Sequence, residues 1–362
     1  MERTKIGIIG CGNISSIYLE NLNQRFETVT VDAVADLDNS RAEAQAARFG
    51  VPRVINVDEM LADPAIEIVV NLTIPRAHFS VCRDALLSGK HVYVEKPLSI
   101  DLADGQALQA LAESKGLLLG GAPDTFLGAG IQTCQDLIAA GEIGRPIGAT
   151  AFMTCHGHES WHPDPEFYYQ VGGGPMFDMG PYYLTALFTL LGPARRLTGS
   201  TAISFPQRTI TSEKKRGQVI DVEVPTHVAG IIDFASGAIG TILTSFDVWA
   251  AELPRIEIYG SQGTLSVPDP NAFGGPVRLR KAGSNTFEEV SITRPFADNS
   301  RGLGVVDMAR ALREGRSDHR ASGALALHVL EAMHGFHIAS REGRHYEMVS
   351  KLSTSTVNLL TL

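Results

Sequence analysis

Short apolar runs alternate with helical segments along the first third of the chain. Apolar runs predict buried strands over residues 5–9, 28–36, 54–55, 66–72, 91–95 and 117–121. Between these runs, apolar residues at helical spacing and capping residues predict helices over residues 13–25, 39–49, 76–87 and 101–115. Because strands alternate with helices, we expect a parallel, doubly wound α/β sheet in this part of the chain.

The pattern changes after residue 122. A helix is predicted over residues 125–141, and two more over 303–316 and 321–341. Runs punctuated by Gly and Pro predict the strands of a large antiparallel sheet, over residues 147–154, 196–204, 227–234, 238–248, 255–260, 263–267, 277–281 and 288–292. The Ser236-Gly237 pair predicts a hairpin between two of them. We therefore expect two domains, residues 1–122 and 123–362, the second of α+β type.

The composition is that of an ordinary globular protein, with 362 residues, 44% of them hydrophobic and 20% charged. The net charge of −9 argues against nucleic acid or an anionic membrane as the main partner. The N-terminus lacks the long apolar core of a signal peptide, and no apolar stretch approaches the roughly 20 residues of a membrane span. Four scattered cysteines indicate reduced thiols, so we expect a cytoplasmic protein.

Candidate ligand-binding residues lie where the predicted strands end. The segments concerned are Gly10 to Ser15, Asp36, Thr73 to Pro75, and Glu95 to Pro97. Open parallel sheets bind ligands at the carboxyl ends of their strands. We therefore expect these segments to meet at one crevice.

The stretch Gly10-Cys11-Gly12-Asn13-Ile14-Ser15 follows a strand, opens a helix, and is followed by Asp36 at the end of the next strand. This context is that of a dinucleotide-binding turn, although Ser15 stands where Gly or Ala is usual. Gly10 permits the turn, and Gly12 lets a pyrophosphate approach the helix N-terminus. Asp36 can accept hydrogen bonds from ribose hydroxyls, which favours NAD; Arg41 leaves NADP open as an alternative.

The stretch GGGPMFDMGPYY, residues 172–183, surrounds the single carboxylate of Asp178 with glycines. One interpretation is an active-site segment in which the backbone approaches a ligand and Asp178 positions a hydroxyl group. The alternative is a glycine-rich turn in which Asp178 caps a helix over residues 179–191 and Tyr182 only packs.

Three segments together resemble the glucose–fructose oxidoreductase, inositol dehydrogenase and rhizopine-catabolism (Gfo/Idh/MocA) family: TIPRAH at 73–78, GKHVYVEKPLS at 89–99, and GGGPMFDMGPYY. The resemblance implies a Rossmann domain followed by a domain built on a large, open, mostly antiparallel sheet. It also implies an NAD(P)-dependent dehydrogenase of sugars, polyols or their derivatives, and a homodimer or homotetramer formed through the sheet of the second domain.

The same resemblance implies roles for individual residues. Lys96 would lie beside the nicotinamide and the hydroxyl group being oxidised, Glu95 would contact the nicotinamide-side ribose, and Asp178 would be the active-site aspartate. The residues expected beside the cofactor are Thr73, Pro75 and His78. This chain departs from the family at Tyr182, which replaces a histidine, and at Pro123 to Phe126, which replaces an aromatic-x-Arg-Arg-Phe pattern and brings Asp124 to the substrate side.

Oxidation of a secondary alcohol requires a group that accepts the hydroxyl proton. Lys96 can accept it if burial lowers its pKa, whereas a charged Lys96 would hold and polarise the oxygen. Tyr182 is the other candidate, because a neighbouring lysine can stabilise a phenolate. The sequence leaves both open.

The segment HGHESWHPDPEFYYQ, residues 156–170, contains three histidines and several aromatic residues. A zinc site is disfavoured because no carboxylate stands at an obvious ligand spacing, so we expect no metal. Aromatic faces suit the C–H surfaces of sugars, so we expect Trp161, His162, Tyr168 and Tyr169 to line a sugar pocket. The alternative is a surface loop over the sheet.

We therefore expect an NAD-dependent oxidoreductase acting on a sugar, polyol or sugar derivative. Two other functions remain open: a glycosidase or lyase that recycles NAD through transient oxidation, and a non-catalytic sensor that binds NAD(P) and a sugar.

Overall fold

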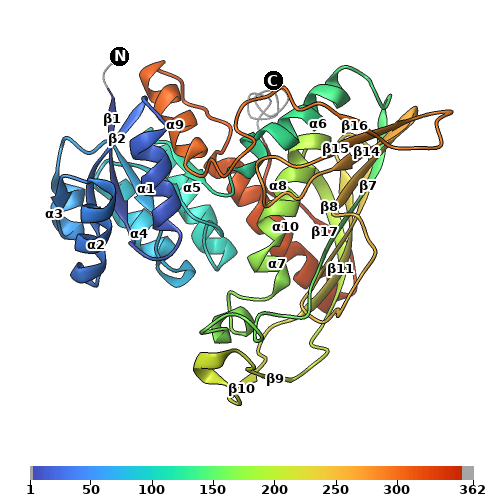
Figure 1. Ribbon diagram of the computed structural model, residues 1–362, viewed down its shortest axis with the longest axis horizontal. Helices are drawn as coiled ribbons and strands as arrows, with labels where there is room; N and C mark the ends of the chain where they lie inside the picture. Colours follow the sequence, from blue (N-terminus) through green and yellow to red (C-terminus); the bar gives the residue numbers. More distant parts are fainter. Residues whose placement is uncertain (1–2, 353–362) are drawn as a thin grey trace.

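The computed structural model describes residues 3–352, which form two large sheets joined by a layer of helices (Figure 1). The first sheet and its helices lie on the left of Figure 1, and the second sheet lies on the right. A small lobe carrying two short strands, β9 (Gln207–Thr209) and β10 (Val219–Asp221), projects at the bottom.

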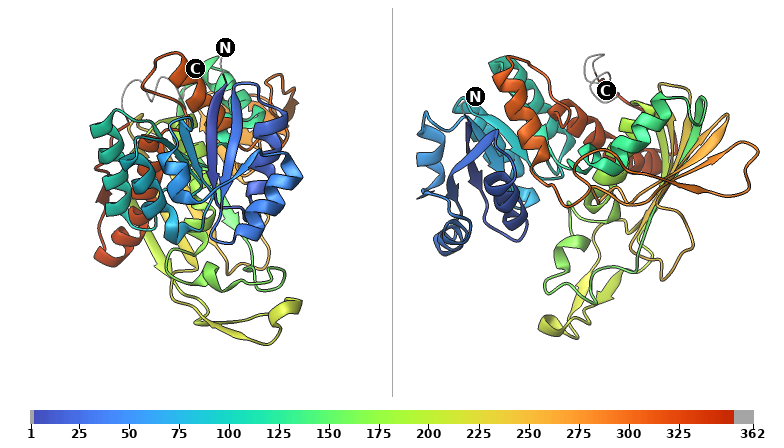
Figure 2. Two further views of the ribbon diagram at one scale, coloured as in Figure 1. Left: turned by 90° about the vertical axis from the view of Figure 1, so that its left-hand side faces the viewer. Right: turned by 45° about the horizontal axis from the view of Figure 1, so that its top comes forward.

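The first sheet has six parallel strands in the order β3-β2-β1-β4-β5-β6. Its strands are β1 (Thr4–Ile9), β2 (Val29–Ala35), β3 (Arg53–Val54), β4 (Ile68–Asn71), β5 (His91–Val94) and β6 (Leu119–Gly121). Helices lie on both of its faces (Figure 2): α1 (Ser15–Gln24), α2 (Asn39–Phe49), α3 (Val57–Ala62), α4 (Pro75–Leu87) and α5 (Leu102–Lys115). The expected doubly wound sheet is confirmed.

The second sheet has nine strands in the order β16-β15-β14-β13-β7-β12-β11-β8-β17. The strands are β7 (Pro146–Thr154), β8 (Ala194–Ala202), β11 (His227–Phe234), β12 (Ile239–Ser245), β13 (Ile256–Gly260), β14 (Gly263–Val267), β15 (Val277–Lys281), β16 (Glu288–Val290) and β17 (Tyr346–Glu347). Every pairing is antiparallel except that of β7 with β12. The expected mostly antiparallel sheet and the β11–β12 hairpin are therefore confirmed.

Helices cover only one face of this second sheet (Figure 1). They are α6 (Ala129–Ala139), α7 (Pro175–Asp178), α8 (Gly180–Leu191) and α10 (Gly323–Glu342). On the opposite face, Ile231 of β11 and Ile239 of β12 are exposed. The residues next to them along each strand point to the other face and are mostly buried.

The chain returns to the first sheet near its end. The helix α9 (Leu303–Arg313) lies beside the first sheet, and α10 runs between the two sheets, packing against α5, α8, β6 and β8 (Figure 1). Residues from both halves of the chain therefore meet at the carboxyl end of β5, where Lys96 contacts Asp178.

The helix expected over 125–141 is interrupted at Gly128, between a short 3-10 helix η1 (Thr125–Leu127) and α6. A side chain at Gly128 would lie 2.5 Å from the Phe273 carbonyl oxygen, so the close approach of another segment ends the first turn. The elements α3, β9, β10 and β17 were not predicted from the sequence. Each has at most six residues, which is too short to show a clear periodicity.

Among the helices of residues 3–352, none is long and apolar enough to cross a membrane.

Candidate active site

The glycine turn after β1 has the shape that a dinucleotide requires. Gly10 has φ +101°, and a Cβ there would lie 2.6 Å from the carbonyl carbon of Leu72, so only glycine fits. A Cβ on Gly12 would meet no protein atom within 4 Å. The N-cap of α1, Ile14, offers no side-chain hydrogen bond, and Ser15 N–H donates to the Gly12 carbonyl oxygen at 3.1 Å. The N–H groups that follow Ser15 in the first turn are therefore the ones available to a phosphate.

Asp36 is held by two backbone N–H groups at the end of β2. Its Oδ2 accepts a hydrogen bond from Cys11 N–H at 2.7 Å, and its Oδ1 accepts one from Asp38 N–H at 2.9 Å. Leu37 and Ile74 follow the strands on either side of β1, and their side chains are largely exposed. These residues fit the ribose and the flat base of a bound dinucleotide.

Lys96 and Asp178 form an ion pair between the two halves of the chain. Lys96 Nζ lies 2.9 Å from Asp178 Oδ1 and donates a second hydrogen bond, of 2.7 Å, to the Asp178 carbonyl oxygen. Burial lowers the pKa of Lys96, but the charge of Asp178, the hydrogen bond to it and the charge of Glu95 outweigh burial, so the pKa is raised above its usual value. Asp178 ends α7 and does not cap α8, whose N-cap is Met179 without a side-chain hydrogen bond.

His158 is the third member of this cluster. Its Nε2 lies 3.5 Å from Asp178 Oδ2, and its ring packs on Tyr168 with a centroid distance of 3.9 Å. Burial raises the pKa of Asp178, but Lys96 and His158 outweigh burial and lower it. The aromatic pattern of residues 156–170 predicts Tyr168 as a sugar-pocket residue. His158 is not predicted at the site, and its only signal is its position in that segment.

Tyr182 lies on the first turn of α8, beside Lys96. Lys96 Nζ is 5.2 Å from the centroid of the Tyr182 ring. Burial raises the pKa of Tyr182, while the charges of Lys96 and Arg301 act in the opposite direction. The phenol is therefore protonated at neutral pH and can donate a hydrogen bond.

Glu95 and His78 fix the loops around Lys96. Glu95 accepts hydrogen bonds from the Tyr18 hydroxyl at 2.8 Å and from its neighbour Lys96 N–H at 2.9 Å. The fully buried His78 ring contacts the carbonyl oxygens of Pro97 and Thr73, at 2.6 and 3.1 Å. Its role in this geometry is to join the two loops, because its side chain has no exposed surface.

Two residues expected at the substrate are turned away from the site. Asp124 is buried, and its Oδ2 accepts the N–H groups of Gly302 and Gly304 at 2.9 and 3.0 Å, at the start of α9. Tyr169 is fully buried, and its hydroxyl donates to Glu159. Both side chains satisfy buried hydrogen-bonding groups, which leaves them no surface for a substrate.

Trp161 and His162 lie on the lobe at the edge of the site. The side chain of Trp161 is exposed, and His162 Nδ1 accepts a hydrogen bond from Asp164 N–H at 3.1 Å. The lobe is anchored by the buried Arg208, which pairs with Glu159 and with Asp247. In residues 3–352 no group of three or more His, Cys, Asp or Glu side chains could hold a metal ion.

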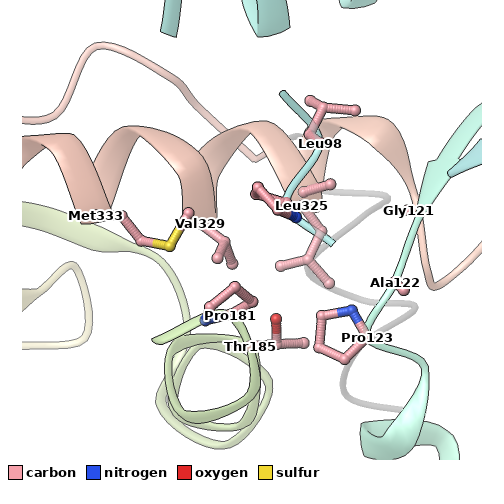
Figure 3. A pocket seen from close by; sticks show the side chains of 11 residues that line it. Leu98, Gly121, Ala122, Pro123, Pro181, Thr185, Leu325, Val329 and Met333 are labelled. Carbon is pink, nitrogen blue, oxygen red and sulfur yellow. The ribbon is translucent and has the colours of Figure 1, made fainter. Parts of the chain in front are cut away.

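Figure 3 shows a small apolar cavity behind the site, between α8 and α10. Its volume is about 10 Å³, which holds at most one water molecule, so it is no substrate pocket. Its lining includes Pro97 and Pro181, the neighbours of Lys96 and Tyr182. The packing around it therefore supports the two residues from behind.

The first domain is a parallel doubly wound domain with a dinucleotide turn, and Lys96 at the end of one of its strands is paired with Asp178. Together these features are those of an NAD-binding oxidoreductase. Comparison with known families agrees: residues 4–121 match the oxidoreductase family with an NAD-binding Rossmann fold, and residues 131–266 match the GFO/IDH/MocA C-terminal domain. The chain belongs to the Gfo/Idh/MocA family, as the sequence motifs predicted.

Relatives of the chain cover most of its length. It is 30% identical to a dTDP-3,4-didehydro-2,6-dideoxy-alpha-D-glucose 3-reductase of Streptomyces antibioticus, over 86% of this chain and 90% of that protein. It is 25% identical to a myo-inositol 2-dehydrogenase of Thermotoga maritima, over 72% and 74%. A levoglucosan dehydrogenase solved with NADH and L-sorbose shares the fold, with a TM-score of 0.81, 19% identity, and coverage of 97% and 100%.

Proposed function

We propose that this protein transfers a hydride between a nicotinamide and a secondary alcohol or ketone of a sugar, polyol or sugar derivative. The observation that carries the proposal is the partly buried Lys96–Asp178 pair beside Tyr182, at the strand ends where the glycine turn also lies. The three relatives named above have a sugar, a polyol or an anhydrosugar in their names, which supports this substrate class.

In the proposed reaction the cofactor, when bound, would supply or accept the hydride, and side chains of the protein donate or accept the proton. Lys96, held in its charged form by Asp178, binds the reacting oxygen and stabilises its negative charge. Tyr182, on the same side of the crevice, gives the proton to that oxygen during reduction and takes it back during oxidation. Thr73, Pro75 and Glu95 would hold the nicotinamide half of the cofactor.

NAD is the proposed cofactor in preference to NADP. Both carboxylate oxygens of Asp36 are fixed by backbone N–H groups. The negative charge of Asp36 is therefore held where the 2′-phosphate of NADP would lie, and it would repel that phosphate. We further propose that the protein acts in the cytoplasm as a homodimer or homotetramer. The face of the second sheet that carries Ile231 and Ile239 would be covered by another copy.

The test combines nicotinamide absorbance with chemical analysis of the substrate. Purified protein is incubated with NAD or NADP and with sugars, inositols and sugar acids, in parallel with Lys96→Ala and Tyr182→Phe. We expect NADH formation with one class of substrate. Both variants should lose activity, by about 100-fold or more, while the affinity for NAD stays within about tenfold.

Substrate loss without net NADH would instead support a glycosidase or lyase that recycles NAD. Tight binding of NAD and a sugar, without any conversion, would support the sensor. Full activity of Lys96→Ala would remove Lys96 from the mechanism.

A further inference from the structure

Arg301 lies in the segment between β16 and α9, which crosses from the second sheet to the first domain (Figure 1). Its guanidinium group is partly buried and is fixed by two neutral amides. Nη1 donates to Asn299 Oδ1 and Nη2 donates to Asn271 Oδ1, both at 2.8 Å, and the guanidinium lies 5.9 Å from the centroid of Phe273. The cation is therefore held in one orientation.

No carboxylate of residues 3–352 forms an ion pair with Arg301 within 4.0 Å. The buried Arg208, in contrast, pairs with Glu159 and Asp247. Asp124 is in the same region, but its Oδ2 is engaged by Gly302 and Gly304 N–H. A partly buried cation without an anionic partner is costly, which indicates a place where an anion binds.

The position of Arg301 connects it with the substrate side of the crevice. Its charge acts on Tyr182, whose ring also faces Lys96 Nζ. Lys96 is in direct contact with Asp178, whereas Arg301 has no carboxylate of the described residues within 4.0 Å, and the charge of Asp124 acts on it only from a greater distance. Asn21 of α1 binds only the backbone carbonyl oxygen of Arg301, whereas the guanidinium group itself contacts Asn271 and Phe273 of the second domain. We therefore expect the group that fits here to belong to the substrate.

We propose that Arg301 binds an anionic group, a carboxylate or a phosphate, carried by the substrate. The inference rests on the proposed function and narrows its substrate class to acidic or phosphorylated sugars and polyols. A guanidinium group matches both anions because two parallel N–H groups can bind two oxygens. Arg301 thus sets specificity, while Lys96 and Tyr182 act on the reacting carbon's oxygen.

The experiment compares neutral and anionic members of matched sets, such as glucose, glucuronate and glucose 6-phosphate, or inositol and inositol phosphate. For each, kcat and KM are measured with the wild type, Arg301→Gln and Arg301→Lys. We expect the wild type to prefer an anionic member, and Arg301→Gln to lose about 100-fold in kcat/KM for it, mainly through KM. Activity on neutral members should fall much less, because only the effect of Arg301 on Tyr182 is lost there, so the anionic-to-neutral ratio of kcat/KM should fall at least about tenfold. The carboxylate and phosphate arms show which anion is bound, and Arg301→Lys should restore part of the preference.

Binding provides the same comparison without turnover. Calorimetry with glucuronate and with glucose 6-phosphate on the protein–NAD complex should detect at least one of them, and binding should weaken at least about tenfold in Arg301→Gln. If no sugar supports hydride transfer, the proposed function fails while this binding result still decides the role of Arg301. Equal use of neutral and anionic members by the wild type would overturn the proposal. So would an equal loss for all substrates, or a large loss of NAD affinity in Arg301→Gln.

Discussion

His158 Nε2 lies 3.5 Å from Asp178 Oδ2, the carboxylate oxygen that Lys96 does not bind. Nδ1 of the same ring is buried and has no partner among residues 3–352. A proton on Nδ1 would therefore lack an acceptor, which favours the tautomer with its proton on Nε2, facing Asp178. His158 and Lys96 together fix both oxygens of Asp178.

Replacing His158 should weaken the hold on Asp178. His158→Phe retains a ring against Tyr168 but removes the donor, whereas His158→Gln retains an N–H group. We expect kcat/KM to fall by about 10- to 100-fold in His158→Phe and to recover substantially in His158→Gln. The contact with His158 lowers the pKa of Asp178, so its loss should move the acid limb of the pH–rate profile to higher pH. Equal losses in both variants with an unmoved acid limb would show that His158 serves only packing.

The two glycines of the dinucleotide turn should respond differently to alanine. At Gly12 a Cβ meets no protein atom, so Gly12→Ala should keep the thermal stability of the cofactor-free protein and weaken NAD binding at least about tenfold. At Gly10 the positive φ and the contact with Leu72 should cost about 2 kcal/mol or more of unfolding free energy. Calorimetric unfolding and NAD titration measure both effects. Unchanged NAD affinity in Gly12→Ala would place the cofactor elsewhere.

Asp36 should determine the choice between the two cofactors. Asp36→Asn removes the charge and retains an acceptor for one of the two N–H groups, whereas Asp36→Ala removes both hydrogen bonds. We expect both variants to raise the NADP/NAD ratio of kcat/KM at least about tenfold, and Asp36→Ala also to lower the melting temperature. The ratio is obtained from initial rates at varied cofactor concentration. A constant ratio would mean that the ribose is recognised by other residues.

His328 should make the protein sensitive to acid. It is fully buried; Nε2 accepts a hydrogen bond from Ala194 N–H at 3.0 Å, and Nδ1 lies 2.8 Å from Ser350 Oγ. Burial lowers its pKa to about 4, so between about pH 6.5 and 4 the unfolded chain binds a proton that the folded protein does not. The free energy of unfolding should therefore decrease as the pH is lowered from about 6.5 to 4. This residue contributes up to about 1.4 kcal/mol per pH unit to that decrease.

His328→Gln removes this titration while keeping a possible acceptor for Ala194 N–H. Denaturant unfolding at several pH values should give a shallower slope between pH 6.5 and 4 than the wild type. Some slope should remain, because burial also lowers the pKa of His319 and His337 to about 4. The same slope in both proteins would show that His328 does not contribute.

Local sequence patterns were enough to predict the two sheets, the helices that accompany them and the position of the dinucleotide turn. The alternation of short apolar runs with helices specifies a parallel sheet, because strands buried on both faces need continuous apolar residues. The turn at Gly10 and the position of Lys96 are equally local, since each depends on a few consecutive residues at the end of one strand. The lysine–aspartate pair followed from family motifs, because no local pattern connects Lys96 with Asp178.

In the irregular segments, contacts with distant parts of the chain determine which side chains face the site. Tyr168 and Tyr169 are adjacent, yet Tyr168 packs on His158 beside Asp178, while Tyr169 is buried against Glu159. Asp124 appeared as a substrate contact and instead binds the N–H groups at the start of α9. Outside helices and strands no periodicity sets the direction of a side chain. Its direction depends on distant partners such as Arg208 and Gly302, which only the folded chain brings close.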